Sequence, residues 1–294
     1  QNQAFFQLIR NMEWKKTDIQ WGLSQRMQWY DDNTLFEQPK FQYIPGSFLQ
    51  AQRKLGNRLD ILAGVRADHH QSHGLVFSPR LNLKYSGEKG PTLRLNAGTG
   101  FRVVNLFTED HAALSGSRVV EIRENLRPEE SWHLGLHLDH YFVFNHSYLR
   151  FEMSSFYTEF SNRIVPNFDI DPQLIVYENS NTMAHNYGLS SKLSWNFEGL
   201  KIDLGATYAI NTSGNGEERE ALLFSPPLTA NAQVAYERTK WSVQVQSNFT
   251  GSMPLPEIPA PYTRPNESDP FFQHHVKLAW KMNGAWTASI SVRN

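Results

Sequence analysis

The sequence of 294 residues contains no cysteine. This absence excludes a disulfide scaffold, a zinc–thiolate site and a cysteine nucleophile. A net charge is almost absent too, because 28 lysines and arginines balance 29 aspartates and glutamates. Without a basic field, a nucleic-acid partner is not expected. Long apolar runs are also missing, and without a stretch of about 18 apolar residues no transmembrane helix is expected.

A secretion signal and catalytic patterns are missing as well. The chain starts QNQAFF, so we expect either that a signal peptide has been removed or that the chain begins inside a longer protein. No nucleophile elbow or acid–base pair occurs at useful spacing. The glycine-rich segment 98–102 opens no helix and is not a phosphate cradle. We therefore expect no enzyme activity and no cofactor.

Alternation between apolar and polar residues is the main signal that is present. In the segment 75–107, Leu81 and Leu83 alternate with Arg80 and Asn82. A period of two over such a length predicts β-strands with one apolar and one polar face. Aromatic residues make up 13% of the chain, and many fall near the ends of apolar faces, as in the aromatic girdles of membrane barrels.

About fourteen strands of about 10–15 residues are expected, longer than the usual strand and suited to a tilted path through a bilayer. The expected strands are 2–11, 16–30, 47–56, 58–70, 74–86, 91–102, 129–143, 147–160, 184–197, 200–211, 225–237, 240–250, 271–282 and 285–294.

The connections between these strands alternate in length. The expected short turns are 11–15, 55–57, 86–90, 143–146, 198–199, 238–239 and 282–284. The expected loops on the other side are 31–46, the brief 69–73, 103–128, 161–185, 211–224 and 251–270. Short turns on one side and longer loops on the other are typical of outer-membrane barrels. The sequence therefore predicts an all-β fold, a transmembrane antiparallel β-barrel.

Several segments resemble one family. SPRLNLKY at 78–85, TLRLNAGTGFRVVNLFTEDHAAL at 92–114 and ENLRPEESW at 124–132 are similar to motifs of the TonB-dependent outer-membrane receptors. YDDNT at 30–34 and SVRN at 291–294 are also similar. Within the family, the resemblance is to the ferric-siderophore and cobalamin receptors of Bacteroidetes-type bacteria.

The resemblance implies a barrel of about 22 strands in the bacterial outer membrane, closed by a plug domain. Residues 1–294 would then be the C-terminal part of the barrel, with about fourteen strands, and without the plug and the closing strand. Expected partners are outer-membrane lipid, the plug domain, the TonB complex through the N-terminal region, and a small-molecule or iron-chelate ligand. Because lipid does not tolerate open sheet edges, we expect that this part alone cannot transport.

The implied function is TonB-energised uptake of a bulky nutrient, a ferric siderophore or a cobalamin-type compound. The candidate ligand-binding residues lie in the loop 103–128 and are Asn105, Glu109, Asp110, His111, Arg118 and Arg123. One alternative is a haem receptor with His111 as iron ligand. The others are a passive porin or surface adhesin, and a barrel enzyme, for which no suitable Ser/His pair is found.

Charged residues on the polar parity of the strands are predicted to line the lumen. They are Arg66, Arg80, Arg94, Arg102, Arg150 and Glu152. We expect most of them to pair with one another or with the plug, and some to steer an anionic chelate. His69, His70 and His73 form a weaker candidate metal site, for which a solvated turn is the competing interpretation.

Overall fold

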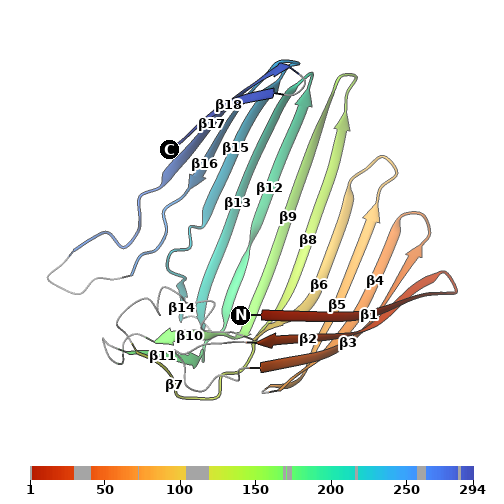
Figure 1. Ribbon diagram of the computed structural model, residues 1–294, viewed down its shortest axis with the longest axis vertical. Helices are drawn as coiled ribbons and strands as arrows, with labels where there is room; N and C mark the ends of the chain where they lie inside the picture. The colour runs from red at the N-terminus through yellow and green to blue at the C-terminus, as the bar shows by residue number, and fades with distance from the viewer. Residues whose placement is uncertain are drawn as a thin grey trace. The chain divides into compact units, whose positions relative to one another are not determined.

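All regular elements in the described part of the chain are β-strands (Figure 1). The computed structural model describes residues 2–29, 41–71, 73–103, 119–167, 170, 174–215, 218–256, 263–283 and 286–294. Within these residues, no helix is long and apolar enough to cross a membrane. The chain forms two units: the first comprises residues 1–85, 95–134 and 158–184, and the second comprises the remainder.

The first unit contains a run of antiparallel strands in sequence order. These strands are β1 (Asn2–Trp14), β2 (Thr17–Trp29), β3 (Phe41–Leu55), β4 (Leu59–His70), β5 (Gly74–Ser86) and most of β6 (Thr92–Arg102). A separate three-stranded sheet has the order β10-β11-β7. Its members are β7 (Val119–Ile122), β10 (Ile164–Asn167) and β11 (Leu174–Asn179).

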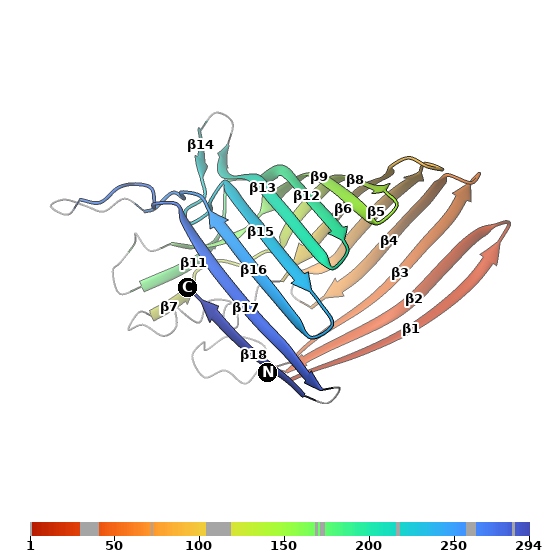
Figure 2. The same cartoon turned by 90° about the horizontal axis from the view of Figure 1, so that it is seen from above.

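The second unit continues in the same antiparallel manner, and Figure 2 shows its last strands, β15 to β18, side by side. Its strands are β12 (Ala184–Phe197), β13 (Leu200–Asn215), β14 (Glu218–Ala221), β15 (Leu228–Glu237), β16 (Trp241–Thr250), β17 (Phe271–Asn283) and β18 (Trp286–Arg293). The long strands β8 (Glu129–Val143) and β9 (Ser147–Asn162) contribute residues to both units.

Register separates apolar from polar side chains in both units. In the first, Trp21 pairs with Leu49 and Leu49 with Val65, whereas Gln20 pairs with Gln50 in the next row. Because successive residues of a strand point to opposite faces, these rows belong to an apolar and a polar face. The pairing confirms the alternation that the sequence predicts.

The second unit has apolar rows that cross five strands. One row runs Leu200, Tyr236, Val243, Leu278 and Ile290 from β13 to β18. Its aromatic and branched side chains favour strands because they pack against neighbours in the same row. The side chains of these rows are nevertheless half-exposed or exposed, so the face is covered by no other layer of the described chain.

Two of the short turns that join neighbouring strands have a backbone conformation typical of β-hairpins. Lys15 and Lys16 between β1 and β2 have φ values of 48° and 64°, and Glu198 and Gly199 between β12 and β13 have 41° and 89°. Two consecutive residues with positive φ are the signature of type I′ turns, whose twist matches that of the flanking strands.

Buried apolar side chains are few among the described residues. They are Ile44, Ile175, Val176, Tyr177 and Ala184. Three of the five lie in β11, so the small sheet of the first unit has the only tightly packed apolar cluster in the described part of the chain. The long strands instead expose apolar side chains on one face, which a surrounding apolar solvent would stabilise.

The antiparallel all-β class is confirmed, and each expected strand coincides with a long strand. Some boundaries were wrong: the turn expected at 11–15 is confined to Lys15 and Lys16, and the strand expected from residue 47 begins at Phe41. Four short strands, β7, β10, β11 and β14, lie in segments expected to be loops. The first three pair with one another, contacts between distant segments that local periodicity does not reveal.

Candidate functional site

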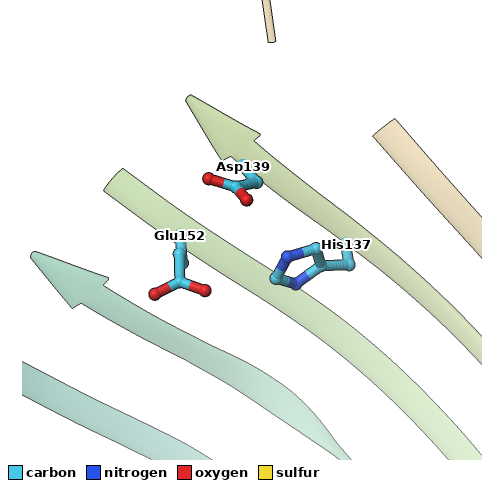
Figure 3. Close-up of side chains that lie close together, drawn as sticks. All are labelled: His137, Asp139 and Glu152. Atoms are coloured by element: carbon cyan, nitrogen blue, oxygen red, sulfur yellow. The ribbon is translucent and has the colours of Figure 1, made fainter. Parts of the chain in front are cut away.

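A cluster of titratable side chains lies on the polar face of the β8–β9 hairpin (Figure 3). His137 and Asp139 come from β8 and Glu152 from β9, all half-buried, with ligand-type atoms within 4.8 Å of one another. Counting outward from the short turn puts Glu152 opposite Asp139. Two carboxylates in opposing positions repel each other unless a cation lies between them.

Arg150 supplies that cation. The Nη2 atom of its guanidinium lies 2.9 Å from Asp139 Oδ2 and 2.9 Å from Glu152 Oε1. Its Nε donates to Asp139 Oδ1 at 3.1 Å. His137 Nδ1 lies 2.7 Å from Ser154 Oγ across the same hairpin. The cluster is therefore a charge-neutralising network, and a metal ion would have to replace the guanidinium between the two carboxylates.

A second network lies on the polar face of the first unit. Arg66 Nη2 is 2.5 Å from Asp68 Oδ1 and donates to Ser24 Oγ at 2.8 Å. Asp68 is buried, and a side chain at Gly46 would collide with this ion pair. Gly46 thus leaves the space in which the bidentate pair forms.

The other predicted lumen arginines differ in their surroundings. Arg102 Nη2 lies 2.6 Å from Glu129 Oε2, with 58% of the arginine side chain exposed. Arg80 donates to Gln50, which itself donates to Gln20 Oε1 at 2.8 Å. Arg94 is exposed on β6. Pairing within the polar face is thus observed for Arg66, Arg102 and Arg150, while the lumen role stays a prediction.

Most of the predicted ligand-binding residues fall outside the described residues. They are Asn105, Glu109, Asp110, His111 and Arg118. Arg123 is described, directly after β7, where its Nε donates to Glu121 Oε2 at 2.9 Å and both side chains are about half exposed (52% and 45%). An exposed ion pair of this kind contributes little stability, so the guanidinium is held only loosely.

The histidine corner between β4 and β5 brings two of its three members together. The rings of His70 and His73 are stacked, with centroids 4.6 Å apart. His69 is exposed and lies on the opposite parity of β4, so it does not join them. Burial lowers the pKa of His73. A stacked pair is a packing contact, and the geometry does not form a ready chelate.

Sequence reasoning missed a polar network that holds the segment before β8. Asn162 Nδ2 donates to Pro128 O at 2.9 Å, and Asn179 Nδ2 donates to Asn125 O at 3.0 Å. The Arg127 backbone N–H donates to Asn179 Oδ1 at 2.8 Å. Both asparagines are buried. The signal available in the sequence was that each of two strand-forming segments ends in an asparagine, Asn162 and Asn179.

Comparisons with known proteins identify the fold. The sequence matches the family described as TonB dependent receptor-like, beta-barrel, over residues 4–294. No curated protein sequence matches the chain. Among solved structures, the siderophore receptor PirA from Acinetobacter baumannii is similar, with 13% identity, a TM-score of 0.76, and coverage of 99% of this chain and 50% of that chain.

Two further structures show how widely this fold is used. A mutant of the ferric enterobactin receptor PfeA from Pseudomonas aeruginosa has 14% identity and a TM-score of 0.75, covering 99% of this chain and 48% of that chain. The copper transporter OprC has 15% identity and a TM-score of 0.73, covering 99% and 50%. The chain thus spans about half the length of these structures.

The family match and the structural similarity agree over nearly the whole chain. They confirm the barrel fold class and the family resemblance of the sequence motifs. In barrels of this class the apolar face of each strand meets lipid and the polar face meets the interior. The chain therefore belongs to the TonB-dependent receptor β-barrel family of the Gram-negative outer membrane.

Proposed function

We propose that the chain is the barrel part of a receptor that takes up a ferric siderophore with energy from the TonB complex. The observation that carries this proposal is the similarity of the fold to siderophore receptors over 99% of the chain. The proposed partners are outer-membrane lipid around the barrel, a plug domain inside it, the TonB complex, and the iron chelate. The family is one of receptors, and we propose no enzymatic step.

The charges of the polar face support an anionic cargo. Arg80 and Arg94 are exposed on that face, and Arg102 remains 58% exposed although it pairs with Glu129. Guanidinium groups bind carboxylate and catecholate oxygens with several N–H donors at once. Partly exposed arginines also raise the local concentration of an anion through their field. We therefore propose that an anionic ferric chelate follows these side chains into the barrel.

Growth on defined nutrients tests this proposal. A strain lacking the gene and a complemented strain are starved of iron, and ferric catecholates, ferric hydroxamates and haem are supplied singly. A parallel pair depends on external cobalamin. We expect the gene to be needed for growth on at least one ferric siderophore. A requirement confined to haem or to cobalamin, or equal growth of both strains on every siderophore, would contradict the proposed cargo.

A further inference from the structure

The apolar face of the second unit carries a groove across β16, β17 and β18. Its volume is about 360 Å³, and Trp241, Trp280, Leu278 and Ile290 are among its lining residues. Register explains its shape, because Trp241 pairs with Trp280 and Trp280 pairs with Ala288. The indole of Trp280 therefore lies between Trp241 and the small methyl of Ala288, and the small side chain of Ala288 leaves a hollow in the row.

The groove is lined by side chains that remain open to the surroundings. Trp241 is 45% exposed, Trp280 52% and Ile290 65%. These residues share the parity that faces lipid in a barrel of this family. An apolar hollow on that face is therefore filled by an apolar chain, and tryptophans flanking it are typical of the level where acyl chains meet headgroups.

The positively charged side chain of Arg238 lies near one end of the groove. The Arg238 guanidinium lies over the Tyr236 ring at 5.4 Å, and its Nε donates to Tyr236 Oη at 2.5 Å. The Tyr236 ring in turn meets Trp241 edge-on, with centroids 5.5 Å apart. The Arg238 backbone N–H donates to Trp241 O at 2.8 Å, which ties the turn to the groove.

The charge of Arg238 is not neutralised within the described residues, where it forms no ion pair. The neighbouring lysine differs, because Lys281 Nζ lies 3.3 Å from Glu237 Oε1, on the polar parity of β17 and β15. Arg238 lies opposite Trp241 and on the same parity as Tyr236, which is the apolar face of this turn. The stacking on tyrosine uses the face of the guanidinium, so the N–H groups at its edge can donate to an acceptor outside the protein.

We propose that this groove and Arg238 bind a glycerophospholipid. One acyl chain lies in the groove beside Trp280 and over Ala288, and the phosphate accepts hydrogen bonds from the Arg238 guanidinium. Arginine forms charge-assisted, multidentate bonds with phosphate, so the positive charge complements the headgroup. The site lies at the short-turn end of the strands, which in outer-membrane barrels is the periplasmic side. The ligand therefore comes from the leaflet that faces the periplasm, which is the phospholipid leaflet.

Native mass spectrometry of the full-length gene product in detergent, titrated with phosphatidylglycerol, tests the site. We expect a bound lipid in the wild type, and about fivefold to tenfold weaker binding in Arg238→Gln, the loss expected for one charge-assisted interaction. Ala288→Trp fills the groove while retaining Arg238, and we expect it to lower binding as well. Heat-modifiable migration on gels checks that each variant is folded.

Arg53→Gln is the matched control. Arg53 is exposed on the apolar parity of β3, close to another short turn, and is not part of the groove. We expect this variant to bind phosphatidylglycerol like the wild type. Equal losses in Arg53→Gln and Arg238→Gln, unchanged binding in Arg238→Gln or in folded Ala288→Trp, or equal affinity for uncharged diacylglycerol would overturn the proposal.

Discussion

At the scale of single residues, Arg150 explains why two carboxylates tolerate opposing positions on β8 and β9. Its guanidinium contacts both Asp139 and Glu152 at 2.9 Å. We expect Arg150→Gln to lower the free energy of unfolding by about 1–3 kcal/mol, because it leaves two half-buried like charges together. Denaturant unfolding of the detergent-solubilised protein measures this change.

Asp139→Asn in the Arg150→Gln background is the corresponding control. Removing one of the two negative charges relieves their repulsion, so we expect the double variant to recover part of the lost free energy. If the double variant were less stable by the sum of the two single changes, the two residues would not be coupled and this account of the cluster would be wrong.

His73 gives the histidine corner a dependence on pH. Burial lowers its pKa from the ordinary value of 6.5, so the folded state disfavours the protonated ring. Its contribution to stability is therefore complete above pH 6.5 and declines as the pH falls from 6.5 toward the folded-state pKa. We expect unfolding midpoints to drop more between pH 7.5 and pH 5.5 in the wild type than in His73→Gln.

An NMR titration of the His73 ring measures the same property directly. A midpoint at or above the ordinary histidine pKa would show that the ring is not shielded by its neighbours. The pairing of His70 with His73, and the exclusion of His69, could be derived from strand parity, because alternate residues of β4 point to opposite faces.

At the scale of elements, the two-residue turn between β1 and β2 holds two lysines at positive φ. Glycine adopts this conformation without a steric cost, whereas a lysine there is strained. We expect Lys16→Gly to raise the free energy of unfolding by up to about 1 kcal/mol, and Lys16→Val to lower it by about 1–2 kcal/mol. Equal unfolding midpoints for the two variants would contradict the assigned turn.

The small sheet depends on the buried Asn179, which accepts from the Arg127 N–H at 2.8 Å and donates to Asn125 O at 3.0 Å. We expect Asn179→Ala to cost about 1–3 kcal/mol, because a buried N–H and a buried carbonyl lose their partner. Proteolysis at residues 123–128 should accelerate in this variant. Unchanged cleavage there would show that the asparagine does not hold the segment.

The long strands and their two faces could be predicted from the sequence because both depend on a period of two. The small sheet could not, since β7 pairs in parallel with β11, which lies more than fifty residues further along the chain. Likewise, alternation predicts that Arg150 and Glu152 share a face, but their meeting with Asp139 depends on the register set by the hairpin turn.

At the scale of the whole molecule, the separation of each strand into an apolar and a polar face accounts for the fold and for the proposed activity. Apolar rows such as Leu200 to Ile290 suit lipid, and the opposite rows carry the arginine networks. The family motifs quoted from the sequence extend over this same chain, which is why the fold class could be predicted before the structure. Uptake follows from the proposal that this barrel works with a plug and the TonB complex.

The central claim is active uptake of a ferric siderophore, and the initial rate of ⁵⁵Fe-siderophore accumulation in whole cells tests it most directly. The rate is measured in wild-type cells, in cells lacking the gene and in complemented cells, each with and without a protonophore. We expect accumulation that requires both the gene and the proton-motive force. Accumulation that is unchanged without the gene, or gene-dependent accumulation that persists with the protonophore, would contradict the claim.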